Sequence, residues 1–252
     1  RKVVQNEEIE VQQYRKVVGL ERTPNGFKLT TQNPKGETGT LQAKMVAVAT
    51  GYYSNPKLLN VPGEDLPNVS HYYTEAHPFY GRNVTIVGAG SSAADTALDL
   101  FKGGANVTMI HRGEDFRHSL KYWIRPNLEN RVKEGSIVAH FNTVVKEITD
   151  DAVIADKEGE RLVIPTDQTF ALTGYYAATD LLEQAGVNID PKDGSAQHST
   201  ETFETNVPGL YAIGSAGYGV RTSDVFIENG LVHAQKALAD MVAKFEGELA
   251  TA

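Results

Sequence analysis

The chain has 252 residues, of which 40% are hydrophobic and 22% are charged, a composition typical of a globular protein with one large or two modest domains. Its net charge of −8, without a long basic stripe, argues against a nucleic-acid-binding surface. The absence of cysteine excludes a disulfide, a thiolate nucleophile or a redox dithiol within these residues, and no apolar run approaches the length of about 20 residues that a membrane span needs.

The first part of the chain is predicted to be rich in strands. Alternating hydrophobic residues indicate strands at Ile9–Val18 and Gly26–Thr31. Met45–Ala49 is a third, apolar strand, and it ends at Thr50 and Gly51. The proline- and glycine-rich residues that follow indicate a surface connection to the next strand.

A dinucleotide-binding motif begins at Val84–Val87, a β-branched run that suits a buried parallel strand. Gly88, Gly90 and Ala93 fill the small-residue positions of G-x-G-x-x-A. The first glycine permits a tight turn, the second lets the backbone approach a pyrophosphate, and the alanine lets helix and strand pack closely.

A helix is expected to follow this glycine turn and to end at Lys102, before two glycines. Ser91 or Ser92 is expected to cap its first turn. The free N–H groups of that turn would then face the phosphates of a bound nucleotide.

The residues after the second strand, Val107–Ile110, select the nucleotide. A site for NAD usually has Asp or Glu about 20 residues after the glycine turn, to bind the ribose hydroxyls. This chain has His111 and Arg112 there, with Arg117 close behind. Two guanidinium groups can clamp a 2′-phosphate, and the acidic residues between them are expected to point outward. The sequence therefore predicts NADPH.

The remaining segments alternate between strands and helices. Tyr122–Glu134 is expected to be a helix. Five short strands are expected next: Ile137–Phe141, Val144–Ile148, Ala152–Ala155, Arg161–Ile164 and Gln168–Leu172. A short helix at Leu181–Ala185 and a strand at Leu210–Ile213 precede a long helix, Ser223–Phe245, capped by Ser223. The tail Glu246–Ala252 is expected to fray.

Two strand ends carry the same short pattern. Val48–Tyr52 reads VATGY, and Leu172–Tyr175 reads LTGY. At each, the chain can turn against a bound nucleotide with no side chain in between.

Together these motifs resemble the pyridine-nucleotide flavoproteins with two dinucleotide domains, a group that includes the thioredoxin reductases. The resemblance rests on four segments: Val48–Gly51, Gly88–Ala93 with its basic segment His111–Arg117, Leu172–Gly174 and Thr205–Ser215. It implies an α/β fold of two Rossmann-like domains, in which an NADPH domain is inserted into a truncated FAD domain. Residues 1–78 and 177–252 would belong to the FAD domain, and residues 79–176 to the NADPH domain.

Within this group, Asn83–Leu100 and Val225–Gln235 most resemble the bacillithiol-disulfide reductase-like family. The resemblance implies FAD and NADPH as cofactors, a low-molecular-weight disulfide as substrate, no internal CxxC, and a homodimer. A cytoplasmic location is expected by default from the composition. It also implies an N-terminal strand–GxGxxG–helix for the FAD adenosine diphosphate, which this sequence lacks.

The resemblance also implies FAD contacts at both strand ends. Near the nicotinamide–flavin junction it places Gly174 and Tyr175, and at the flavin diphosphate Gly214 and Ser215, where the group usually has Asp in place of the serine. Phe226 is expected at the isoalloxazine edge. The full set of expected flavin contacts is Thr50, Gly51, Thr173, Gly174, Tyr175, Gly214, Ser215 and Phe226.

Three other functions remain open on the sequence. A flavin monooxygenase shares the glycine-rich turns, but its F-x-G-x-x-x-H signature is broken by Asp65 and Pro67. A ferredoxin–NADP reductase also needs no dithiol, and a regulatory NADPH-binding module needs no flavin. The sequence assigns no catalytic side chain, and its seven histidines are without metal-ligand spacing, so no metal is predicted.

Overall fold

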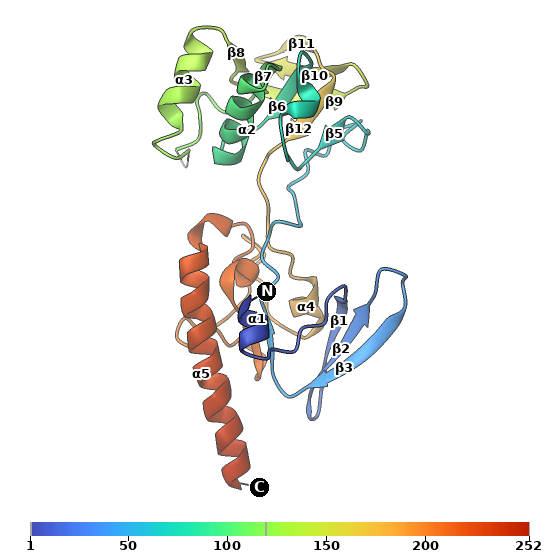
Figure 1. Cartoon of the computed structure of the whole chain (residues 1–252), viewed down its shortest axis with the longest axis vertical. Helices are drawn as coiled ribbons and strands as arrows, with labels where there is room; N and C mark the ends of the chain where they lie inside the picture. Colours follow the sequence, from blue (N-terminus) through green and yellow to red (C-terminus); the bar gives the residue numbers. More distant parts are fainter. Residues whose placement is uncertain (1, 119, 252) are drawn as a thin grey trace. The chain divides into compact units, whose positions relative to one another are not determined.

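The chain folds into two compact units in the computed structural model, which describes residues 2–118 and 120–251 and the side chains up to residue 247. Unit 1 combines Arg1–Asn55 with Tyr175–Ala252, and unit 2 is the continuous segment Pro56–Gly174 (Figure 1). Residues 56–78, which the sequence analysis grouped with the first FAD segment, pack in unit 2 because their strand β5 (Val69–Ser70) pairs with strand β12 there.

Unit 2 is built on a five-stranded sheet in the order β5-β12-β6-β7-β8, and every neighbouring pair is parallel. The strands and helices of this layer are β6 (Asn83–Val87), α2 (Ser91–Lys102), β7 (Asn106–Ile110), α3 (Arg125–Lys133), β8 (Ile137–His140) and β12 (Gln168–Ala171), with a 3-10 turn η1 (His77–Phe79). All carboxyl ends therefore lie along one edge of the sheet, where open α/β sheets bind their ligands.

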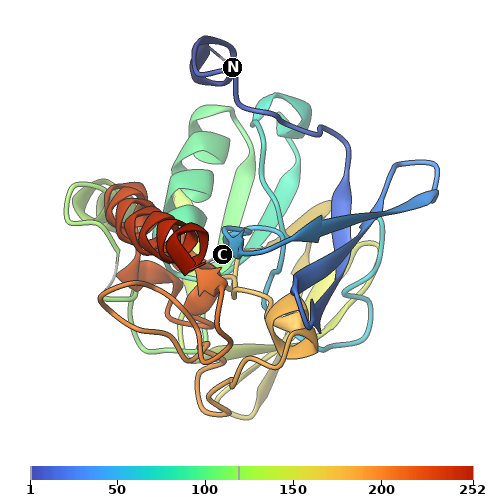
Figure 2. The ribbon, with the colours of Figure 1, turned by 90° about the horizontal axis from the view of Figure 1, so that it is seen from below.

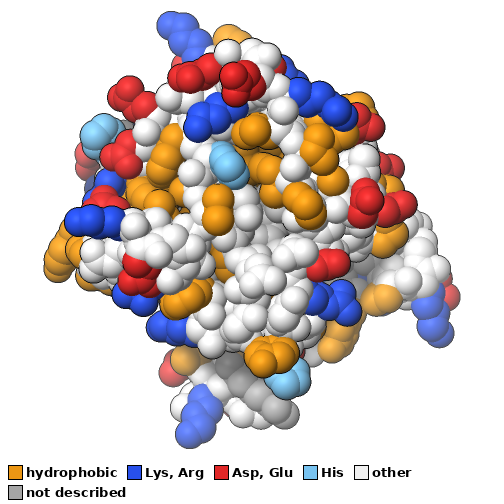
Figure 3. All heavy atoms as spheres, turned by 90° about the horizontal axis from the view of Figure 1, so that it is seen from above, with side chains coloured by type: hydrophobic (Ala, Val, Ile, Leu, Met, Phe, Trp, Pro, Cys, Tyr) orange, Lys and Arg blue, Asp and Glu red, His pale blue; other side chains and the backbone are white. Residues whose placement is uncertain are grey.

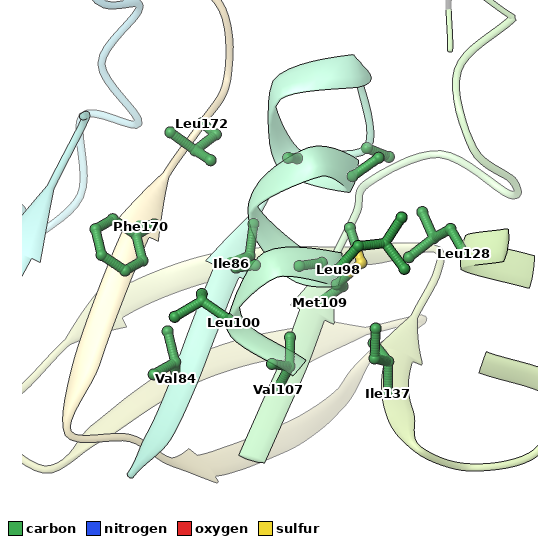
Figure 4. Packing of buried hydrophobic residues seen from close by; sticks show 14 of the residues in the cluster. Val84, Ile86, Leu98, Leu100, Val107, Met109, Leu128, Ile137, Phe170 and Leu172 are labelled. Atoms are coloured by element: carbon green, nitrogen blue, oxygen red, sulfur yellow. The ribbon is translucent and has the colours of Figure 1, made fainter. Parts of the chain in front are cut away.

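Burial of aliphatic side chains holds α2 against this sheet. Figure 4 shows Leu100 of α2 near Val84 and Ile86 of β6 and Val107 of β7, and each of these side chains is at most 3% exposed. Burying one such side chain stabilises the fold by about 2 kcal/mol. The short β-branched strands predicted from the sequence are thus the centre of a closed core.

A second, antiparallel sheet packs within unit 2. Its strands follow one another along the chain as β9 (Thr143–Ile148), β10 (Ala152–Lys157) and β11 (Glu160–Pro165), in the order β11-β10-β9. Val145, Val153 and Ile164 from these strands form a core together with Val87 and Ile110 of the parallel sheet.

Unit 1 has a smaller set of paired strands. Its elements are α1 (Lys2–Asn6), the antiparallel strands β1 (Lys16–Thr23), β2 (Gly26–Gln32) and β3 (Thr38–Ala43), the parallel pair β4 (Val46–Val48) and β13 (Leu210–Ala212), α4 (Asp180–Gln184), the 3-10 turns η2 (Gly214–Gly217) and η3 (Thr222–Asp224), and α5 (Ile227–Thr251). Figure 2 shows the antiparallel strands and α5 from a second direction.

Three local predictions for unit 1 are wrong. The first strand begins at Lys16, not Ile9, because Ile9 and Val11 are each 51% exposed and have no core to face. The last helix begins at Ile227 rather than after a Ser223 cap, since residues 222–224 form η3. That helix also continues through the predicted frayed tail to Thr251, and Ala252 lies outside the described residues.

The surface is mixed in charge. On the face drawn in Figure 3, basic and acidic side chains are interspersed around groups of hydrophobic ones. Among the described helices, none is both long enough and apolar enough to cross a membrane.

Candidate cofactor site

The glycine turn after β6 requires its first glycine. Gly88 has a φ of +138°, and a Cβ there would lie 2.3 Å from the carbonyl oxygen of Leu172. Its N–H donates a 2.9 Å hydrogen bond to the carbonyl of Ile110, which ties the turn to β7. Any other residue would clash with backbone, so the turn fixes the direction in which α2 starts.

The second glycine leaves open space instead. Gly90 is extended, with φ −89° and ψ −175°. Around a Cβ built at Gly90, the only atom within 4 Å is Cδ of Arg117, at 3.9 Å. Packing does not demand a glycine here, and the bare backbone leaves room for the close approach of a ligand such as a pyrophosphate. Ala93, 1% exposed, fills the third small position inside the core.

The serines do not cap α2, contrary to the sequence analysis. The helix already includes Ser91 and Ser92 as its first two residues, its N-cap is Gly90, and no side chain bonds to the first turn. Ser91 Oγ instead accepts a 3.4 Å hydrogen bond from the N–H of Lys121. Because the N-cap Gly90 has no side chain to cap them, the N–H groups of Ser92 and Ala93 in the first turn of this twelve-residue helix can receive an anion.

The basic residues after β7 lie beside this turn. The backbone of His111 is held on both sides, donating to His140 at 2.8 Å and accepting from Thr143 at 3.0 Å. Arg117 donates its N–H to Ala89 at 3.2 Å, and its side chain passes over Gly90. Within the described part of the chain, neither Arg112 nor Arg117 forms a salt bridge, so both are available to an anionic ligand.

Asp115, one of the two acidic residues between the arginines, is mostly exposed, and it pairs with Arg125 at the start of α3. The two side chains are 3.3 Å apart, and the N–H of Phe116, followed by Arg125, lowers the pKa of the Asp115 carboxyl. Arg125 also donates to the carbonyls of Phe116 and Arg117, at 3.0 and 3.2 Å. It therefore fixes the loop that carries Arg117. Sequence analysis missed this role.

The electrostatics favour a neutral imidazole beside permanent cations. Burial, reinforced by Arg112 and Arg117, lowers the pKa of His111. Because an ordinary histidine titrates near pH 6.5, His111 is neutral at pH 7. Burial and the same two arginines lower the pKa of Lys57, a cation of unit 2 that sequence analysis also missed.

Unit 1 brings some of the expected flavin residues together. A Cβ built on Gly51, which follows Thr50 at the end of β4, would lie 3.9 Å from Ser215 Oγ. Gly51 and Gly214 both have positive φ, of +68° and +61°. Near Gly214, the start of α5 approaches through Gly230, whose built Cβ lies 3.6 Å from the Gly214 Cα.

The other expected flavin residues have separate surroundings. Phe226, 64% exposed, precedes α5. Tyr175 packs its ring against Tyr53, with centroids 4.9 Å apart. In unit 2, Thr173 Oγ1 donates to the carbonyl of Lys57 at 2.5 Å, and Gly174 has a φ of +102°. Thr173 thus supports the backbone, and Gly174 lies in the connection that follows β12.

Comparison with known proteins identifies the family. The family model described as pyridine nucleotide-disulphide oxidoreductase matches residues 1–214. The chain belongs to this family. The FAD and NADPH predicted from the sequence are the cofactors of this enzyme family, and the prediction is confirmed at that level.

Individual relatives agree with the predicted resemblance. The bacilliredoxin reductase Bdr of Bacillus subtilis is 40% identical over 198 residues, which are 78% of this chain and 61% of that protein. The bacillithiol disulfide reductase Bdr (YpdA) of Bacillus cereus has 36% identity and a TM-score of 0.94 over 97% of this chain and 75% of its own.

The fold is that of a two-domain flavoprotein of the thioredoxin reductase type. The thioredoxin reductase of T. acidophilum matches 96% of this chain and 79% of its own with a TM-score of 0.75, at 24% identity. The chain spans about three fifths of the length of the Bacillus subtilis relative.

Proposed function

We propose that this chain is the nucleotide-binding part of an NADPH-dependent flavoprotein that reduces a low-molecular-weight disulfide of the bacillithiol-disulfide type. The observation that carries the proposal is the pair Arg112 and Arg117, unpaired with any described acid, beside an uncapped helix and a bare glycine turn. The names of the Bacillus subtilis and Bacillus cereus relatives support the disulfide as acceptor.

In this proposal the residues of unit 2 hold NADPH. The turn Gly88–Ala93, with Gly90 and the N–H groups of Ser92 and Ala93, receives the pyrophosphate. Arg112 and Arg117 bind the 2′-phosphate through charge-assisted hydrogen bonds, and neutral His111 lies beside them. A bound flavin would accept hydride from the nicotinamide and pass two electrons to the disulfide.

The FAD contacts are proposed at residues where strands end in glycine turns. Gly51 and Gly214 offer bare backbone to the flavin diphosphate, and Ser215 offers one neutral hydrogen bond where the group usually has a carboxylate. The remaining proposed contacts are Thr50, Thr173, Gly174, Tyr175 and Phe226. We also propose a cytoplasmic homodimer, which follows from the family resemblance and from NADPH as reductant.

The test compares the two reduced nucleotides. NADPH should bind at least about tenfold more tightly than NADH, because two guanidinium groups meet a doubly charged phosphate that NADH lacks. Arg112→Ala should remove most of this preference and leave NADH affinity unchanged. The matched control Arg161→Ala changes an exposed arginine on β11 of the same unit. Equal affinities in the unmodified chain would contradict the proposal.

Acceptor assays separate the other functions. Oxygen-coupled hydroxylation would indicate a monooxygenase, and ferredoxin reduction a ferredoxin–NADP reductase. A protein that binds NADPH and no FAD, even when FAD is supplied, would be a regulatory module. The two Bdr relatives favour disulfide reduction over these three.

A further inference from the structure

The backbone of Lys57 is held beside the residues that follow the carboxyl end of β12. Its N–H donates to the carbonyl of Gly174 at 2.9 Å, and its own carbonyl accepts from Thr173 Oγ1 at 2.5 Å. Its side chain then passes Gly174, because a Cβ built there would lie 3.9 Å from Lys57 Cδ. The residues that follow β12 therefore hold the backbone of Lys57, and β12 is the strand next to β6, after which the glycine turn at Gly88 begins.

This lysine is placed among like charges. Of the described cations, Arg117 and Arg112 act on it most strongly, and together with burial they lower its pKa. No described carboxylate forms a salt bridge with Lys57, whereas Lys28, Lys236 and Lys244 each pair with a glutamate. A half-buried ammonium beside two guanidinium groups is unfavourable unless an anion lies between them.

The order of the strands indicates which part of the nucleotide supplies the anion near Lys57. The strands run β12-β6-β7, so Lys57 beside the end of β12 and Arg112 after β7 lie on opposite sides of the glycine turn after β6. Neighbouring strands are about 4.8 Å apart, so the turn separates the two cations by the width of one strand on each side. The 2′-phosphate is assigned to the β7 side, and the pyrophosphate lies at the turn itself.

We propose that Lys57 is a further nucleotide-binding residue that contacts the pyrophosphate of the dinucleotide. This inference rests on the proposed NADPH site and adds a contact to it from outside the glycine motif. It assigns separate tasks to the cations: Arg112 distinguishes NADPH from NADH, and Lys57 strengthens the binding of both.

The experiment measures NADP⁺ and NAD⁺ affinities by calorimetry for the whole chain and three variants. Lys57→Met should weaken both nucleotides by about tenfold, the loss of one hydrogen bond to a charged group, and leave their ratio unchanged. Lys57→Arg should retain most of the affinity. Lys146→Met, an exposed lysine of β9 in the same unit, is the matched control and should bind as the unmodified chain does.

A second measurement needs no variant. Mild acylation of the unmodified chain, followed by mass spectrometry, reports how accessible Lys57 is. 5′-ADP, which carries the pyrophosphate without a 2′-phosphate, should slow acylation of Lys57, whereas 2′-AMP should not.

Two results would overturn the inference: Lys57→Met binding both nucleotides normally, or a loss confined to NADP⁺ with protection by 2′-AMP alone. Failure of the proposed function is distinct, because it appears as equal NADP⁺ and NAD⁺ affinities in the unmodified chain, whatever Lys57 does.

Discussion

The two units have similar glycine turns, but the amount of buried packing around those turns differs greatly. In unit 2, a turn follows a strand inside a five-stranded parallel sheet, and the helix after it buries Leu100 completely. In unit 1, the turns after β4 and β13 follow a pair of three-residue strands. Helix α5 exposes 82% of Ile227 and 61% of Leu238. The glycine turn of unit 2 is therefore fixed by more packed structure than the turns of unit 1, and the nucleotide-specific binding site is proposed in unit 2.

The largest expected difference concerns the first glycine of each turn. Gly88→Ala should lower the free energy of unfolding by about 4 kcal/mol, because it adds a clash with Leu172 to a strained φ. Gly214→Ala has the strained φ of +61° but nothing within 4 Å, and should cost about 1 kcal/mol. Urea denaturation of both variants measures this, and equal losses would refute the comparison.

Shortening a leucine side chain should also destabilise the protein more in unit 2 than in unit 1. Leu100→Ala should destabilise unit 2 by about 3 kcal/mol, since it leaves a cavity under α2. Leu238→Ala on α5 should change stability by less than about 0.5 kcal/mol because that side chain is mostly in solvent. Thermal denaturation followed by circular dichroism gives both values. A large effect of Leu238→Ala would contradict the exposure of this side chain on α5.

The smallest expected effect is pH-dependent and concerns how α5 is held to β13. The hydroxyl of Tyr211, which is fully buried, donates to Asp240 at 2.5 Å, and Lys244 lies 2.7 Å from the same carboxylate. Lys244, followed by Tyr211, lowers the pKa of Asp240. A lowered pKa stabilises the fold above the ordinary value of about 3.9, and this contribution is lost as the pH falls through the folded-state value.

Asp240→Asn should therefore cost about 1 kcal/mol at pH 7, and the cost should shrink below about pH 4. Denaturation curves across this pH range measure the difference from the unmodified chain. A cost that stays constant to acid pH would show that the carboxylate charge is not what holds α5. Asp99→Asn on α2 is the matched control in unit 2, where the partner is the hydroxyl of Tyr73.

The parallel core of unit 2 could be predicted from the sequence because the residues that indicate it are close together along the chain. The β-branched run before Gly88 and the small residues after it have only one common structural use. Arg112 and Arg117 follow within a few residues of their strand, so their role as a phosphate-binding pair could be proposed from spacing.

Residues brought in by distant segments could not be predicted. The position of Lys57 is set by Thr173 and Gly174, more than a hundred positions later, which bond to its backbone. Arg125 acts through carbonyl groups, which leave no trace in side-chain patterns. The prediction of a serine cap for α2 was wrong because Gly90, which has no side chain, occupies the N-cap position.

The central claim is that the cations after β7 bind a 2′-phosphate, and two mononucleotides test it most directly. 2′,5′-ADP and 5′-AMP differ only in that group, so calorimetric titration of each isolates its contribution. The account predicts that 2′,5′-ADP binds at least about tenfold more tightly, with a preference that falls as salt is raised and disappears in the double variant Arg112→Ala, Arg117→Ala. Equal affinities for the two, or a preference that survives the loss of both arginines, would contradict it.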